Sequence, residues 1–222
     1  MREFPAIGAA QFDVFTAAQA GVAGWTSHAL RHAVTIGRLD RLRPGVYAPP
    51  VPPSGNRFAD AEQRLRHCAV AVALTNPGLA LSHAAAASLR GIAFVEIPTY
   101  VCATTLRGRR GEVHGVHLHR VASLSSAVQR RGPVVATSPA RTVLDLGREH
   151  GVDACIAAGD SAVRLGLTTA AELVETADRC ERWPGIAAAR RTVSLVDPHA
   201  ESVLESLSRL RIVTCGLPLP LT

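Results

Sequence analysis

The sequence contains no lysine, and all 24 of its basic residues are arginine. A phosphate-binding loop of the Walker type requires a lysine, so this class of nucleotide-binding protein is excluded. The glycine-containing stretches do not fit the dinucleotide-binding pattern either. Aromatic residues are scarce, at 4%, although 47% of the residues are apolar and many of these are alanine. This composition is sufficient for a buried core and favours closely packed helices.

Cysteine is sparse and scattered. The five cysteines are odd in number, lie far apart and form no C-x-x-C pair. This excludes a disulfide framework and a zinc ribbon, and it indicates a reducing compartment. No apolar run approaches the roughly 18 residues of a membrane-spanning helix, and the residues after Met1 do not have the pattern of a secretory signal. We therefore predict a cytoplasmic protein with no membrane partner and no cofactor.

The charge is positive and unevenly distributed. The net charge is +6 and the pI is about 9.7. Residues 1–57 carry six arginines against three acidic residues, residues 58–146 ten against five, and residues 147–222 eight against ten. A basic surplus suits a polyanion such as nucleic acid. We expect any nucleic-acid contact in the first two thirds of the chain.

Capping signals predict two short helices near the start of the chain. Thr16 can cap a helix over 17–20, and a tight turn follows at 21–24. Thr26 or Ser27 can cap a second helix that reaches Ile36 and ends at Gly37. On this second helix the apolar residues 30, 33 and 34 share one face. The opposite face carries polar groups suited to phosphates and base edges, namely Ser27, His28, Arg31, His32 and Thr35.

A basic hairpin is predicted directly after these helices. Two short strands around Pro44–Gly45 would place Arg38, Arg41 and Arg43 near a DNA backbone. The order helix, turn, helix, hairpin is that of a winged helix-turn-helix. Arg31 would then contact guanine through a bidentate pair in the major groove. The alternatives are a merely solvated polar face and a helix-turn-helix that binds protein.

Proline divides the chain after this segment. Residues 49–56 read PPVPPSGN, which cannot continue a helix or a central strand. We predict an α+β fold, in which a winged helix-turn-helix precedes a mixed helix-and-strand domain and a helical C-terminal part. The predicted domains are residues 1–48, a linker at 49–57, the mixed domain at 58–196 and a final segment at 197–222.

Within the mixed domain, helical periodicity covers 61–74, and strands are predicted at 99–105 and 116–121. Ser82 can cap a helix that runs to Arg90 and ends at Gly91. From Ser138 the pattern is helical almost to the end. Breaks fall at Gly151, Gly166, Pro184–Gly185 and Asp197–Pro198.

Several stretches in order resemble the AbiEi family of antitoxins from type IV toxin-antitoxin systems. They are FTAAQAG at 15–21, RPGVY at 43–47, LSHAAAASLRG at 81–91 and TSPARTVLDL at 137–146. The resemblance covers most of residues 12–146. It implies a repressor that binds its own promoter and counteracts a nucleotidyltransferase-like toxin. Winged-helix proteins often bind as symmetric pairs, so a homodimer or cooperative binding to the operator is expected.

The C-terminal residues are similar to actinobacterial proteins in which this architecture is fused to a Vsr-like endonuclease. The stretch VDPHAESVLES at 196–206 carries this similarity, and it implies that 197–222 is the truncated start of a nuclease-like domain. After Glu205 no Asp, Glu or His follows up to Thr222, although a metal-dependent nuclease needs convergent carboxylates. Glu201 and Glu205, four residues apart, are expected on one solvated helix face. We therefore predict no catalytic residue, no metal and no enzyme, with a degenerate nuclease as an alternative.

Two further groups of residues carry side chains suited to ligands. His117 and His119 would share one face of a strand, where they could bind a metal. We favour the alternative, a half-exposed strand whose histidines face solvent or make a weak phosphate contact. A glycine-flanked loop between the predicted strands could bind phosphate or an acidic partner, or be merely solvated. Its basic residues are Arg107, Arg109 and Arg110. A module that neutralises a partner toxin without binding DNA is the remaining alternative function.

Overall fold

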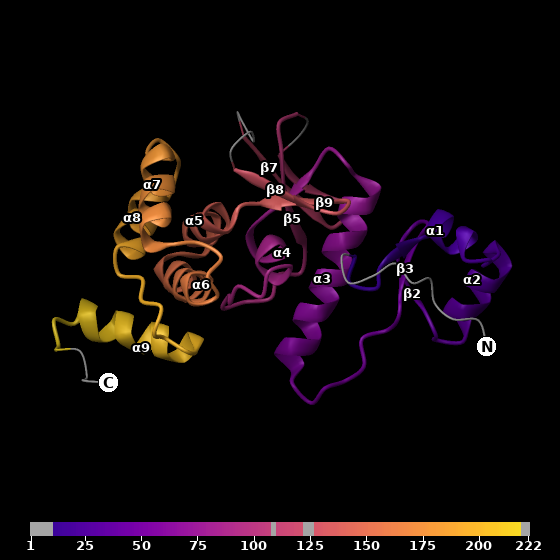
Figure 1. Cartoon of the computed structure of the whole chain (residues 1–222), viewed down its shortest axis with the longest axis horizontal. Coiled ribbons are helices and arrows are strands. Elements are labelled where there is room, and N and C mark those ends of the chain that lie inside the picture. Colours follow the sequence, from indigo (N-terminus) through magenta and orange to yellow (C-terminus); the bar gives the residue numbers. More distant parts are fainter. Residues whose placement is uncertain (1–10, 108–109, 122–126, 219–222) are drawn as a thin grey trace. The chain divides into compact units, whose positions relative to one another are not determined.

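A computed structural model describes residues 11–107, 110–121 and 127–218 and confirms a mixed α+β fold (Figure 1). The chain folds as two compact units. Unit 1 consists of residues 1–81 and 97–136, and unit 2 of residues 82–96 and 137–222. The domain boundaries drawn from the sequence at 48/49, 57/58 and 196/197 stay predictions. No helix among the described residues has the length and apolarity needed to cross a membrane.

The two short N-terminal helices form as predicted, with small differences at their ends. Helix α1 (Ala17–Val22) begins with a capping box, because Thr16 Oγ1 accepts a hydrogen bond from Gln19 N while Gln19 Oε1 accepts one from Thr16 N. This helix continues through residues 21 and 22, where a turn was expected. Helix α2 (Ser27–Thr35) is capped by Thr26, whose Oγ1 accepts from Ala29 N at 3.1 Å.

The predicted hairpin is present and belongs to a three-stranded antiparallel sheet. Strands β2 (Asp40–Arg43) and β3 (Val46–Ala48) form the hairpin, and β1 (Phe15–Thr16) pairs with the other edge of β3. The strand β1 was not predicted, because two residues are too few to show an alternating pattern. The helices and the sheet enclose a core of Phe15, Ala20, Trp25, Leu30, Ala33, Leu39 and Tyr47.

The proline-rich stretch contains neither helix nor strand and leads into helix α3 (Arg57–Thr75). Asn56 caps this helix by accepting hydrogen bonds from the backbone N–H groups of Phe58 and Ala59. Helix α3 contacts β2 and β3 of the N-terminal sheet and also β4 and β5 of a larger sheet. It therefore connects the N-terminal segment to the rest of unit 1.

The larger sheet has six strands in the order β6-β7-β5-β4-β9-β8. The two predicted strands are confirmed as β5 (Val101–Thr105) and β7 (Val116–Arg120), which pair in parallel. Parallel pairing is reached because β6 (Gly111–Val113) inserts a hairpin before β7. The sequence did not predict four other strands because they are short: β4 (Ala80–Leu81), β6, β8 (Val128–Arg131) and β9 (Val134–Thr137).

Unit 2 is helical, and its breaks fall where the sequence predicts them. Its helices are α4 (His83–Ser88), α5 (Pro139–His150), α6 (Val152–Arg164), α7 (Ala170–Arg179), α8 (Ile186–Val193) and α9 (Val203–Thr214). Helices α5 and α6 pack closely at Gly147, where an added Cβ would lie 2.7 Å from Cys155 Sγ. Small residues thus permit the close helix contacts that the composition favours.

Ser82 precedes the predicted helix, but the prediction that its side chain caps this helix is wrong. Ser82 occupies the N-cap position of α4, but its side chain makes no capping hydrogen bond. His83 has a positive φ of 52°, and Ser82 Oγ lies 3.0 Å from His83 Nδ1 instead. The helix ends at Ser88, two residues before the predicted end.

The C-terminal helix α9 is anchored to α6 by a buried ion pair. Asp160, on α6, accepts a 2.8 Å hydrogen bond from Arg209 Nη2 and another from the backbone N–H of Asp197. The Asp160 side chain is 1% exposed, so this contact is shielded from water. The predicted helix face with Glu201 and Glu205 is wrong, because Glu201 precedes α9 and its backbone N–H donates a hydrogen bond to the Glu205 carboxylate.

Candidate nucleic-acid interface

Helix α2 presents a continuous polar face to solvent. Leu30 and Ala33 are buried against the N-terminal core, and Val34 packs beside them. The polar residues of the helix fall on the other side, because an α-helix has 3.6 residues per turn. All five residues predicted there are exposed: Ser27, His28, Arg31, His32 and Thr35.

Thr35 is the member of this face whose side chain bonds to its own helix. Its Oγ1 donates a 3.1 Å hydrogen bond to the backbone carbonyl of Arg31. The hydroxyl oxygen keeps its capacity to accept a hydrogen bond. Thr35 is thus suited to accept from a base amino group, whereas the Arg31 guanidinium supplies donors.

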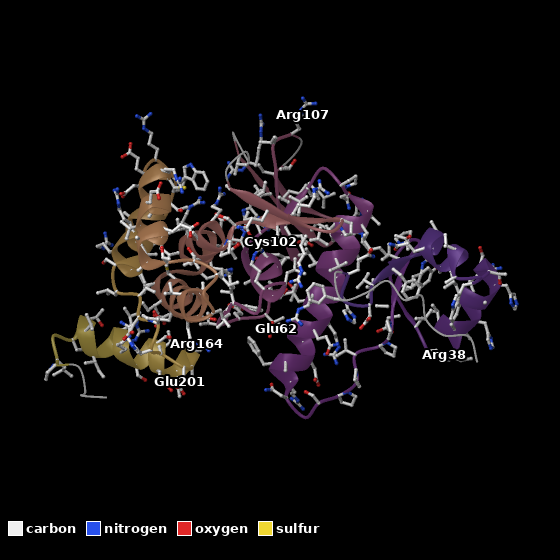
Figure 2. The ribbon with its side chains drawn as sticks, in the orientation of Figure 1. Arg38, Glu62, Cys102, Arg107, Arg164 and Glu201 are labelled. Atoms are coloured by element: carbon white, nitrogen blue, oxygen red, sulfur yellow. The ribbon has the colours of Figure 1, made fainter. Side chains whose placement is uncertain are left out.

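The arginines after α2 differ in exposure. Arg38 is half-buried in the segment between α2 and β2, and Figure 2 labels its position. Arg41 is exposed and Arg43 is half-buried. The sequence predicts all three at one DNA backbone, and the structure does not present them equally.

Arg41 and Arg43 lie on opposite faces of the N-terminal sheet. Arg41 pairs with Tyr47 and Arg43 with Val46, so a β-bulge lies between the two arginines. Cross-strand partners share a face, and the consecutive residues Val46 and Tyr47 point to opposite faces. Tyr47 belongs to the core beneath α1 and α2. Arg41 therefore lies on the face of α1 and α2, and Arg43 on the face that α3 contacts.

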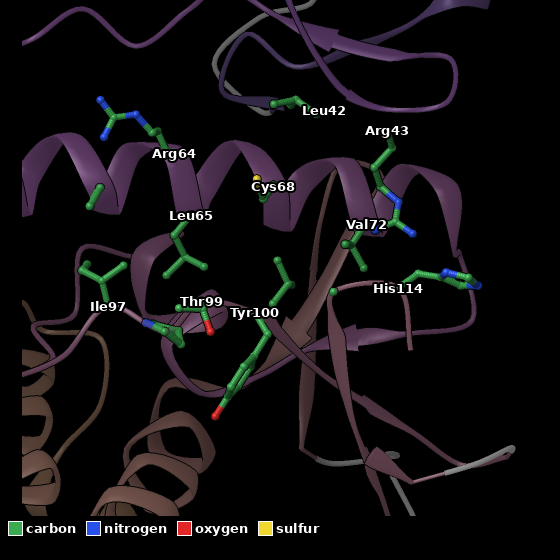
Figure 3. A pocket seen from close by; sticks show the side chains of 14 residues that line it. Leu42, Arg43, Arg64, Leu65, Cys68, Val72, Ile97, Thr99, Tyr100 and His114 are labelled. Carbon is green, nitrogen blue, oxygen red and sulfur yellow. The ribbon is translucent and has the colours of Figure 1, made fainter. Parts of the chain in front are cut away.

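A cavity of about 390 Å³ lies on the α3 side of the hairpin, and we call it the β2–α3 groove (Figure 3). Its lining residues come from β2, from one stripe of α3, from residues 97–101 and from the β6–β7 turn at 114–115. Its basic members are Arg43, Arg64 and His114. The sequence does not predict this groove, because it depends on the bulge and on contacts between distant segments.

The basic loop between β5 and β6 is only partly described. Arg107 and Arg110 are exposed, whereas Arg109 lies outside the described residues; Figure 2 labels Arg107. Thr105 Oγ1 donates to Arg107 O and accepts from Arg107 N, which fixes the start of the loop. The exposed side chains of Arg107 and Arg110 are accessible to an anionic partner.

His117 and His119 share one face of β7, as predicted. Their rings stack with centroids 4.7 Å apart, and the Tyr100 ring centroid lies 5.1 Å from that of His117. Both histidines are half-buried. Partial exposure agrees with the half-exposed strand expected from the sequence, and Tyr100 and the ring stack cover the rest of the histidine surface.

The buried cysteine on α6 is unsuited to nucleophilic chemistry. Burial raises the pKa of the Cys155 thiol to about 12, with a further contribution from the charge of Asp160. Burial also raises the pKa of Cys180. A thiol must ionise to act as a nucleophile, so neither residue is prepared to supply one.

A family model matches the N-terminal segment. Residues 9–50 match the family model described as transcriptional regulator, AbiEi antitoxin, which supports the AbiEi family for this part of the chain. The uncharacterized proteins MT2308 and Rv2248, from two strains of Mycobacterium tuberculosis, are each 31% identical over 106 residues. That alignment covers 48% of this chain and only 38% of each relative.

Among solved structures, the crystal structure of the RV2827C protein from Mycobacterium tuberculosis is similar with a TM-score of 0.45 and 15% identity. The alignment covers 94% of this chain and 78% of that protein.

Proposed function

We propose that the N-terminal segment is a winged helix-turn-helix that binds double-stranded DNA in a sequence-specific manner. The observation that carries this proposal is the exposed polar face of α2, whose opposite side is fixed in the core. A recognition helix needs both properties, because base readout requires donors held at fixed positions. The family match at residues 9–50 covers the same helices and the hairpin.

In this proposal α2 enters the major groove, and Arg31 reads guanine through its two parallel donors. Ser27, His28, His32 and Thr35 contact neighbouring base edges or phosphates. Arg41 is the principal phosphate contact of the hairpin because it is exposed on the α2 face of the sheet. Arg38 and Arg43 contribute less, since both are half-buried.

The regulatory role that fits best is repression of the protein's own operon. The family model's description names a transcriptional regulator, and a repressor needs no activity beyond occupying an operator. Two copies on a symmetric operator would add specificity, since each copy reads one half-site. A dimer or cooperative pair is part of this proposal.

An antitoxin role is the second candidate function, and the description of the matched family favours it. The partner would be a nucleotidyltransferase-like toxin. Exposed Arg107 and Arg110 are the residues we propose for contact with an acidic surface on such a partner, with Arg109 of the same loop. Co-expression with a neighbouring toxin gene tests this role. If the Arg31→Ala variant still rescues growth in the presence of the toxin, toxin neutralisation does not require DNA binding.

Binding to DNA tests the main proposal. The protein is titrated against a fragment from upstream of its own gene and against random DNA of equal length, at several salt concentrations. A site that resists random competitor supports sequence-specific binding. Equal affinity for both fragments would reduce the function to non-specific binding, and no binding at low salt would favour the module that acts only on a protein partner.

A further inference from the structure

We propose that the β2–α3 groove binds a small amphipathic anion, namely a carboxylate or similar group attached to an apolar aliphatic or aromatic body. This site lies on the opposite face of the N-terminal sheet from Arg41, the principal phosphate contact of the proposed DNA interface. The inference goes beyond the proposed function and does not depend on it.

The charge of the groove favours an anion. Its lining residues include Arg43, Arg64 and His114 but no Asp or Glu. Figure 3 shows the side chains of Arg43 and His114 at one end of the groove and that of Arg64 toward the other end. The guanidinium of an arginine matches the two oxygens of a carboxylate. We place the charged group of the ligand at the end with Arg43 and His114.

The remaining lining suits an apolar body. Leu65 and Val72 come from one stripe of α3, and Ile97 and Tyr100 come from the segment before β5, with the Tyr100 ring directed away from α3 and packed against His117 (Figure 3). The volume of about 390 Å³ falls within the roughly 300–1,000 Å³ of small-molecule sites. Apolar walls with a few convergent polar groups are the usual composition of such sites.

Two local features of the backbone place Arg43 and His114 beside this cavity. The β-bulge in β2 turns Arg43 toward α3, away from the side on which Arg41 lies. His114 has a positive φ of 50° in the two-residue turn between β6 and β7, and Gly115 follows with 74°. A two-residue hairpin turn requires positive φ at both of its residues, and His is among the residues that adopt this conformation. The bulge and the turn bring Arg43 and His114 to the same end of the groove.

Displacement of a fluorescent probe tests the proposal. The probe is 1-anilinonaphthalene-8-sulfonate, an aromatic body with one sulfonate. We expect 4-phenylbutyrate to displace it and the neutral amide of the same acid to do so at least about tenfold less well, because the amide lacks the charge that Arg43 recognises. Arg43→Gln should weaken the carboxylate by about tenfold.

Three further variants make the test specific. Cys68 is exposed in the groove, so Cys68→Phe should fill it and abolish displaceable binding. His114→Asn keeps a side chain that tolerates positive φ and should weaken the carboxylate without unfolding the turn. Arg57→Gln removes an exposed arginine of α3 outside the groove and should bind as the unaltered protein does. Thermal unfolding of each variant shows that it is folded.

The proposal is overturned if the amide displaces the probe as well as the acid, if Arg43→Gln and Arg57→Gln bind alike, or if the unaltered protein shows no displaceable binding. The measurement contains no DNA. Its outcome is therefore independent of whether the DNA-binding proposal succeeds or fails.

Discussion

Arg41 and Arg43 are two residues apart in strand β2, yet they lie on opposite faces of the N-terminal sheet. The cause is the β-bulge between them, which advances β2 by two residues while β3 advances by one, from Tyr47 to Val46. Arg41 shares its face with α1 and α2, and Arg43 faces α3. One short strand thus serves two surfaces, a proposed DNA surface and a proposed ligand groove.

The two arginines should therefore differ in their effect on DNA binding. Arg41→Gln should lower the slope of log affinity against log salt by about one unit, because one phosphate contact and its released counterion are lost. Arg43→Gln should change the slope by clearly less. Fluorescence anisotropy of a labelled duplex between about 50 and 200 mM salt measures both slopes. Equal reductions would remove the distinction between the two faces.

Local signals in the sequence predicted the local structure of the N-terminal segment well. Thr16 and Thr26 marked the starts of α1 and α2, and Pro44–Gly45 marked the hairpin, because capping and turn chemistry depend on neighbouring residues. The bulge at Leu42 has no such signal, since it is defined by the pairing of β2 with a different strand. The same limit hid the groove, which requires α3 and the β6–β7 turn to meet β2.

In the second half of the chain, breaks between helices were predictable, whereas the roles of individual polar residues were not. Glycine and proline end helices through backbone geometry alone. Arg141 and Asp145 form an ion pair at 2.8 Å with side chains 3% and 1% exposed, and the Arg141 guanidinium lies over the Trp183 ring. Because Trp183 is distant in sequence from both residues, helical periodicity alone does not reveal this cluster.

The capping box of α1 should contribute measurably to stability. Thr16→Ala removes the side-chain acceptor for Gln19 N and should lower the free energy of unfolding by about 1 kcal/mol. Thr16→Ser retains the hydroxyl and should stay close to the unaltered protein. Urea denaturation of both variants, monitored by circular dichroism, measures the difference. Equal loss in the two variants would assign the effect to the threonine methyl group instead of the cap.

The ion pair between Asp160 and Arg209 should hold α9 on α6. Arg209→Met leaves a buried carboxylate without its cation and should cost roughly 3–5 kcal/mol of stability. The double variant Asp160→Leu, Arg209→Met removes both charges and should recover part of this loss. Urea unfolding gives the energies, and hydrogen exchange of residues 203–214 reports whether α9 is released. Unchanged protection of α9 in Arg209→Met would show that other contacts hold it.

His67 should make unit 1 sensitive to acid. Burial lowers the pKa of the His67 imidazole below its ordinary value of 6.5, and the nearby charge of Arg66 lowers it further, whereas Asp13 and Asp40 raise it. The unfolded chain then takes up the proton first as the pH falls. Stability should be fully present above about pH 6.5 and should decline below it, toward the lowered pKa of the folded state.

The pH dependence can be assigned to His67 by substitution. We expect the loss of unfolding free energy between about pH 7.5 and 5.5 to be smaller in His67→Gln than in the unaltered protein. His28→Gln, which alters an exposed histidine, is the matched control and should keep the full loss. An identical pH dependence in all three proteins would mean that other groups cause the acid sensitivity.

Footprinting on the DNA upstream of the protein's own gene, with Arg31→Ala as the deciding variant, tests the central claim most directly. Sequence-specific readout by α2 predicts a protected site in the unaltered protein and a loss of about 1–3 kcal/mol of specific affinity in Arg31→Ala, with little change on random DNA. Arg57→Ala, which alters an exposed arginine outside the proposed interface, should protect the same site. Equal losses on specific and random DNA, or full protection by Arg31→Ala, would contradict the assignment of α2 as the recognition helix.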